Sequence, residues 1–159
     1  MSPLRCLLLI AAGAGLYYAA VVLLGGVLAA VTVPKAYFEW FGAQHSEVAL
    51  ALLQFASFAL PVALVVAGGT LAVRRLVVGK HGRAVLLAVL FGLIACFAYE
   101  LASLLFFVPS EIPVPALPRA TLLREVLFPP WWAASGFLAP WLGFAFAAWW
   151  SARSASREA

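Results

Sequence analysis

Charged residues are almost absent from four long stretches of this sequence. No Asp, Glu, Lys or Arg occurs in residues 6–34, 48–73 or 126–152, and residues 84–110 contain one charged residue, Glu100. Each stretch is longer than the about 20 residues that an α-helix needs to cross the hydrocarbon core of a bilayer. The stretches are continuously apolar and do not alternate with polar residues, which favours helices over the strands of a barrel.

Composition supports a single integral-membrane domain over residues 1–159. Apolar residues make up 66% of the 159 residues and charged residues 10%, against about 45–50% and about 25% in soluble domains. That balance excludes an ordinary water-soluble domain, a disordered chain and a coiled coil. With only two cysteines, a disulfide scaffold is excluded as well.

The predicted fold is all-α, an antiparallel bundle of four transmembrane helices. We expect the spans at about 7–33, 48–73, 84–108 and 131–150, which leaves outer loops at 34–47 and 109–130 and an inner loop at 74–83. The apolar run of the first span is longer than the core of a signal peptide, so we expect that span to be retained.

The orientation follows from the distribution of Lys and Arg. With four spans, both termini and loop 74–83 share one side, which holds seven of the ten basic residues. The positive-inside rule places that side in the cytoplasm. We therefore expect a multi-pass protein with both termini cytoplasmic, in a bacterial inner membrane as the Arg-, Ala- and Leu-rich composition suggests. Topology and anionic lipid explain the net charge of +4, so no nucleic-acid partner is implied.

Two apolar segments of the outer loops form a candidate interfacial docking surface. The first loop contains four aromatic residues beside Glu39, a composition typical of segments at head-group level. The second contains apolar residues with helical spacing, which predicts a short amphipathic helix on the outer face. The members of this surface are Tyr37, Phe38, Trp40, Phe41, Leu122, Leu123, Val126 and Leu127.

Small residues recur at every fourth position in the third and fourth spans. Such spacing lets helix backbones approach closely in lipid. The residues that we predict to pack against other helices are Ala88, Gly92, Cys96, Ser135, Ala139 and Gly143.

Glu100 is the one formal charge inside a predicted span. It lies on the small-residue stripe of the third span, about 10 Å from the outer end, where a lipid-facing charge costs at least ~2.5–3 kcal/mol. Gln54 and Ser57 lie at a similar depth in the second span, so these three form a candidate intramembrane polar site. Glu100 is then a polar clamp between helices, a proton or substrate site, or a residue at the wet outer rim.

The sequence lacks the usual signatures of catalysis. There is no GxSxG, HExxH, CxxC or phosphate-binding loop, and no Asp. We therefore predict no catalytic residue, no metal site and no cofactor. The leading hypothesis is a non-catalytic accessory, scaffold or assembly subunit that contacts the bilayer and a larger membrane protein or further copies of itself. The alternative is a small transporter, flippase or channel component that uses Glu100. A third, an outer-face enzyme, would need His45 to lie close to a carboxylate such as Glu39.

Overall fold

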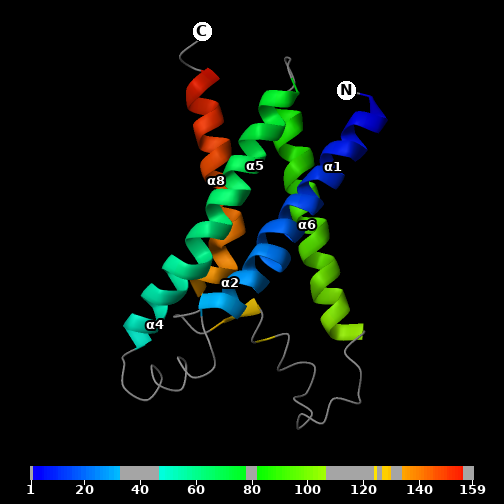
Figure 1. Ribbon diagram of the computed structural model, residues 1–159. Coiled ribbons are helices and arrows are strands. Elements are labelled where there is room, and N and C mark those ends of the chain that lie inside the picture. Colours follow the sequence, from blue (N-terminus) through cyan, green and yellow to red (C-terminus); the bar gives the residue numbers. More distant parts are fainter. Residues whose placement is uncertain are drawn as a thin grey trace.

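The computed structural model describes residues 2–32, 47–77, 82–106, 124, 127–129 and 134–155. Nearly all of these residues are helical, and none of them forms a strand. The helical segments build four rods (Figure 1). The first rod is α1 (Pro3–Tyr17), η1 (Tyr18–Leu24) and α2 (Gly25–Thr32); the second is α4 (Glu47–Gln54), η2 (Phe55–Ala59) and α5 (Leu60–Leu76); the third is α6 (Gly82–Phe106); and the fourth is α8 (Ala134–Ala155).

Three of the described rods are long and apolar enough to cross a membrane. They are Pro3–Leu28, Ala51–Leu76 and Gly82–Ser103. The prediction of a helical membrane protein is therefore supported, with three of its four spans recovered by length and composition. The fourth rod, α8, has 22 residues but contains Pro140 and three tryptophans, so it is less uniformly apolar than the others.

Local signals in the sequence explain where the first rod begins. The backbone N–H of Arg5 donates to Ser2 Oγ at 3.4 Å, and Pro3 occupies the first turn of α1. Ser at the N-cap and Pro directly after it are a favourable start for a helix, because the first backbone N–H groups have no partner within the helix.

The rods alternate in direction along the chain. In Figure 1, α1 and α6 run down while α5 and α8 run up, so the N-terminal and C-terminal ends of the described chain lie at the same end. The most extensive contacts join α1 with α6 and α5 with α8. Each of these two pairs therefore consists of rods that are not consecutive in the sequence and that run in the same direction.

Consecutive rods contact each other less. The short connection at 74–83 suggests that the second and third spans are direct neighbours, yet α5 and α6 share only a minor contact. The first rod joins the two pairs instead. It begins beside α6 and crosses the bundle, so that η1 and α2 contact α5 and η2 (Figure 1).

Backbone contact at glycines brings each pair together. A Cβ atom added to Gly92 of α6 would overlap the carbonyl oxygen of Ile10 in α1, and one added to Gly13 would overlap that of Val89. In the other pair, a Cβ atom at Gly143 would overlap the carbonyl oxygen of Ala63. Close packing of this kind is the main source of helix association in lipid.

The small residues proposed for helix packing all lie on inward sides of their rods. Four of them are buried and two are half-buried. Cys96 packs against the main core cluster, and the Oγ atom of Ser135 is fully buried. The buried members are Ala88, Gly92, Ala139 and Gly143.

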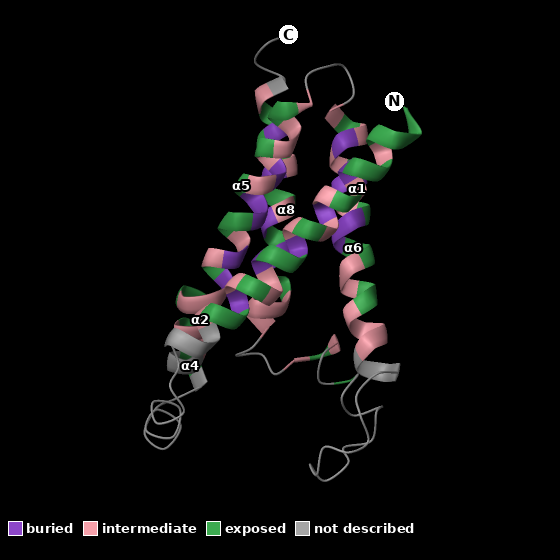
Figure 2. Ribbon diagram, turned by 45° about the vertical axis from the view of Figure 1, so that its right-hand side comes forward, coloured by how far each residue is buried: buried purple, intermediate pink, exposed green. Residues whose placement is uncertain are grey.

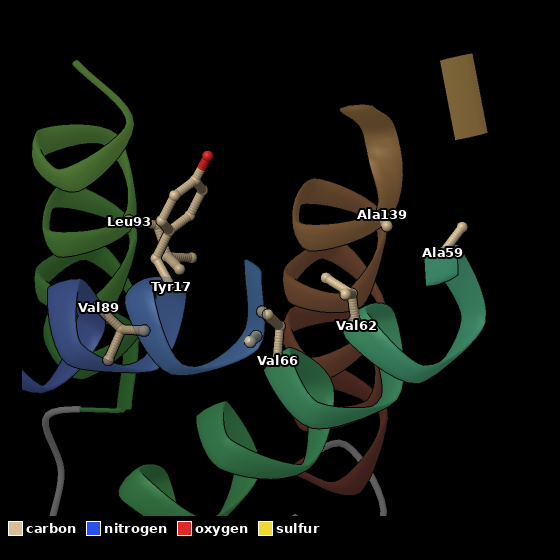
Figure 3. Packing of buried hydrophobic residues seen from close by; sticks show 8 residues of the cluster. Tyr17, Ala59, Val62, Val66, Val89, Leu93 and Ala139 are labelled. Carbon is tan, nitrogen blue, oxygen red and sulfur yellow. The ribbon is translucent and has the colours of Figure 1, made fainter. Parts of the chain in front are cut away.

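One apolar cluster lies where the four rods meet (Figure 3). Its buried members are Tyr17, Ala20, Ala59, Val62, Val66, Val89, Leu93 and Ala139. A smaller cluster of Leu9, Val85 and Ala88 joins α1 to α6 nearer the end that holds the termini. Figure 2 shows buried residues along the inward faces and exposed residues along the outward ones. Many exposed residues are large and apolar, as a lipid-facing exterior requires.

The second rod widens into a π-helical segment, η2, just before Pro61. Proline has no N–H to donate to the preceding turn, and a π-turn is one way to accommodate that loss. The segment holds Phe58 between two neighbouring rods. The nearest atom of its ring lies 2.5 Å from a Cβ atom built on Gly25 and 3.4 Å from one built on Gly136. α8 remains a continuous helix through Pro140.

Most of the outer docking surface lies outside the described residues. This applies to Tyr37, Phe38, Trp40, Phe41, Leu122, Leu123 and Val126. Leu127 is described and half-buried, and Phe128 beside it is exposed. The N–H of Phe128 donates to the carbonyl of Arg124 at 2.8 Å, four residues earlier, as in one turn of a helix.

Candidate functional site

Glu100 of α6 accepts a hydrogen bond from the first rod. The hydroxyl of Tyr17 donates to Glu100 Oε2 at 3.1 Å. Tyr17 is buried in the central cluster, whereas Glu100 is half-buried. The contact follows from the register of the α1–α6 pair. Gly92 meets α1 around Gly13, and one to two turns further along both helices Tyr17 reaches the level of Glu100.

Aromatic rings of two other rods pack near the ring of Tyr17. The ring centre of Tyr17 lies 6.3 Å from those of Phe97 and Trp141. Phe97 also meets Trp141 edge-on at 5.5 Å and Phe137 at 5.9 Å. Because Phe137 and Trp141 belong to α8, the cluster ties three rods together. A hydrogen bond among such apolar groups is stronger than one in water.

The other two residues of the predicted polar site have different neighbours. Ser57 Oγ donates to the carbonyl of Leu53 in its own rod at 2.7 Å. The Gln54 side chain lies against α8, with Nε2 3.0 Å from a Cβ atom built on Gly136. The structure therefore brings Glu100 to Tyr17, while Ser57 bonds to its own backbone and Gln54 faces the start of α8.

Tyr17 was missed as a site residue in the sequence. A signal was present, because Tyr17 follows Gly13 by one helical turn on the face that approaches α6. A buried tyrosine hydroxyl usually finds a hydrogen-bond partner. The next residue, Tyr18, lies in an equally apolar part of the sequence, so the sequence alone did not show which of the two tyrosines is buried. In the structure Tyr18 is half exposed.

The α5–α8 pair contains buried hydroxyls of another kind. Thr70 is 0% exposed and Ser151 1% exposed, and neither hydroxyl has a hydrogen-bond partner within the described part of the chain. Thr70 lies two turns beyond Ala63, and Ser151 just over two turns beyond Gly143. Since Ala63 contacts Gly143, the two hydroxyls lie at the same level of neighbouring helices.

Two further polar atoms, near the opposite end of the same pair, are buried and have no partner among the residues that the structure describes. They are Gln54 Oε1 and Ser135 Oγ. Within residues 2–32, 47–77, 82–106 and 134–155, no three His, Cys, Asp or Glu side chains gather as a metal site would require. The described site can therefore hold helices together or exchange a proton at Glu100, and it offers no set of metal ligands.

Comparison with known proteins gives no family for this chain. No protein-family model matches it, and no significant similarity to a curated protein or to a solved structure was found. The functional argument therefore rests on the residues and contacts described above.

Proposed function

We propose that this chain is a four-span protein of a bacterial inner membrane with both termini in the cytoplasm. The 22 residues of α8 extend for about 33 Å at ~1.5 Å per residue, enough for a hydrocarbon core of ~30 Å. α8 also lies along α5, which is one of the membrane-competent rods. The basic residues at the end that holds both termini support the orientation.

We infer that the chain acts as a non-catalytic accessory, scaffold or assembly subunit of a larger membrane complex. The observation that carries this inference is the bond from Tyr17 to Glu100. The single carboxyl within the described part of α6 joins two helices through Tyr17, and the ring of Tyr17 also lies near Trp141 of α8. An intramembrane carboxyl that is engaged in this way acts as a clamp.

The surroundings of the clamp favour a structural role over transport. A pathway needs successive polar groups, and the nearest contacts of Tyr17 include Phe97 and Trp141. The outward faces of α1 and α6 are apolar, with exposed side chains such as Leu8, Leu87 and Phe91. Such faces suit lipid or the helices of a membrane-protein partner.

Transport remains the alternative function, and two observations favour it. Glu100 is only half-buried, and buried polar atoms without a partner among the described residues occur at two levels of the α5–α8 pair. In a transporter or channel component, Glu100 would exchange a proton or bind substrate. The third hypothesis, an outer-face enzyme, depends on His45 and Glu39, which lie outside the described residues.

Native mass spectrometry of the protein gently extracted from its own membranes tests the proposal. We expect a second membrane protein at fixed stoichiometry, retained by Glu100→Gln and depleted by Glu100→Leu, because only the amide keeps an acceptor for Tyr17. Tyr99→Phe is the control for a change elsewhere on the same helix. Because Tyr99 is exposed, this variant should retain the second protein.

A different result would support transport. The proposal is wrong if the protein is released alone and, in liposomes, catalyses a proton flux that Glu100→Gln abolishes. A lone protein without any such flux would also contradict an accessory role.

A further inference from the structure

Three large aromatic side chains gather on the outward side of α8 near its C-terminal end. The ring centres of Phe146 and Trp149 are 5.8 Å apart, those of Phe146 and Trp150 6.1 Å, and those of the two tryptophans 6.3 Å. Each of the three side chains is about half exposed. The guanidinium carbon of Arg153 lies 4.9 Å from the ring centre of Trp149. We call these four residues the α8 aromatic cluster.

The same end of the molecule is strongly basic. The first turn of α1, the last turn of α5 and the first turn of α6 lie at this end together with the C-terminal end of α8 (Figure 1). Among the residues described there, none is acidic. The arginines that accompany Arg153 are Arg5, Arg74, Arg75 and Arg83.

The α8 aromatic cluster differs from the other exposed apolar surface at this end. The first part of α1, at the same end of the molecule, exposes the aliphatic side chains Leu4, Leu7 and Leu8, as expected beside lipid tails. Tryptophan, in contrast, is enriched at the level of the lipid head groups, because its ring is apolar and its N–H is polar. An arginine stacked on such a ring has the geometry and charge to bind a phosphate.

We propose that the α8 aromatic cluster binds the head group of an anionic phospholipid in the leaflet at this end of the bundle. The rings of Phe146, Trp149 and Trp150 contact the glycerol and upper acyl region, and Arg153 binds the phosphate. The surrounding arginines add the positive field that selects an anionic lipid over a zwitterionic one. This inference rests on α8 reaching the membrane surface, and it holds for an accessory subunit and for a transporter alike.

The test uses the purified full-length protein in bilayer nanodiscs made from equal amounts of phosphatidylcholine and phosphatidylglycerol. Lipids that remain bound after gentle release are counted by native mass spectrometry. We expect the wild type to retain phosphatidylglycerol preferentially. Arg153→Gln should lower that retention about fivefold, which corresponds to the loss of one arginine near an anionic surface.

Two variants distinguish lipid binding at the α8 aromatic cluster from a general attraction of anionic lipid to the basic end of the molecule. Arg75→Gln is the matched control, because Arg75 is exposed at the same end but belongs to α5, and we expect it to lower retention much less. The double variant Trp149→Leu, Trp150→Leu leaves the charge unchanged and should still reduce retention, because it removes the ring that orients Arg153.

Three outcomes would overturn the proposal. The first is equal retention of the two lipids by the wild type. The second is an equal loss for Arg153→Gln and Arg75→Gln, which would mean that only the overall charge attracts lipid. The third is a dimer that disperses when the tryptophans are replaced, which would make the cluster a contact between two copies. Since lipid is measured on the purified chain, failure here is distinct from failure to find a protein partner.

Discussion

The α1–α6 pair and the α5–α8 pair are built alike in their backbones and differently in their polar groups. Within each pair the two helices run in the same direction (Figure 1), and they meet where a glycine lies against a carbonyl of the partner helix. The α1–α6 pair also contains the hydrogen bond from Tyr17 to Glu100. The α5–α8 pair contains the hydroxyls of Thr70 and Ser151, buried and without a described partner.

This difference separates what brings the helices together from what specifies their register. Van der Waals contact at small residues is common to both pairs, so it suffices for association. The hydrogen bond to Glu100 forms at one register of α1 against α6, and a shifted register would leave a carboxyl without its partner in the membrane. We therefore expect glycine substitutions to affect both pairs strongly and polar substitutions to affect mainly the α1–α6 pair.

The largest effect is expected from Gly92→Ala. Its new methyl group would overlap the carbonyl oxygen of Ile10, and a backbone atom cannot move aside as a flexible side chain can. Overpacking of this kind costs about 1–3 kcal/mol of the free energy of unfolding. Gly143→Ala should cost a similar amount, since it meets the carbonyl of Ala63. Reversible unfolding of the purified protein in mixed micelles measures both.

Gly15→Ala is the control for these two variants. Nothing lies within 4 Å of a Cβ atom at Gly15, so the substitution should be neutral or raise the free energy of unfolding by up to about 1 kcal/mol through helix propensity. If Gly92→Ala behaves like Gly15→Ala, the close contact between α1 and α6 is wrong. If only Gly143→Ala is tolerated, the two pairs are not packed alike.

An intermediate effect is expected from the hydrogen bond of the α1–α6 pair. Tyr17→Phe removes the donor and should lower the free energy of unfolding by about 0.6 kcal/mol and at most about 1.7 kcal/mol, the average and the maximum for interhelical hydrogen bonds in a membrane protein. Glu100→Leu should cost more than Tyr17→Phe but less than Gly92→Ala, because it leaves the Tyr17 hydroxyl buried and unpaired. Glu100→Gln should cost least, because its amide oxygen still accepts. The same unfolding assay applies.

Tyr99→Phe provides the baseline for Tyr17→Phe. Both changes remove one tyrosine hydroxyl, but Tyr99 is 69% exposed, so we expect no measurable loss. Equal effects at the two positions would show that the bond from Tyr17 to Glu100 contributes nothing to stability. A loss in Glu100→Gln as large as that in Glu100→Leu would mean that a carboxylate, and not only an acceptor, is needed there.

The helical spans were predictable from the sequence because they depend on local composition. Charge-free stretches longer than a bilayer crossing identify them, and three are recovered as membrane-competent helices. The position of Glu100 along the third span follows from counting residues in the sequence. Its hydrogen-bond partner does not, because counting gives the level of a residue without saying which helix lies beside it.

The pairing of the helices explains why the predicted polar site differs from the observed contact. Gln54 and Ser57 belong to the second rod, which packs chiefly against α8, whereas α6 packs chiefly against α1. The short connection at 74–83 makes the second and third rods consecutive in the chain but does not decide which faces meet. Small residues such as Gly13, Gly92 and Gly143 decide that, and stripes of small residues occur on several rods.

The smallest effects are expected at the buried hydroxyls of the α5–α8 pair. Thr70→Val keeps the shape of the side chain and removes a hydroxyl that has no partner in the described structure. Removing a buried and unpaired polar group relieves its desolvation cost, so the free energy of unfolding should stay the same or rise slightly. Ser151→Ala should behave in the same way, with a small loss from the space that it leaves.

The double variant Thr70→Val, Ser151→Ala sharpens the comparison. If the hydroxyls are independent, the two single effects add, as expected for groups that do not interact. If each single variant instead costs about 1 kcal/mol and the double variant costs no more than one of them, the two hydroxyls bond to each other or through a shared water. Both pairs would then contain a polar link, and the register of α5 against α8 would be specified in the same way as that of α1 against α6.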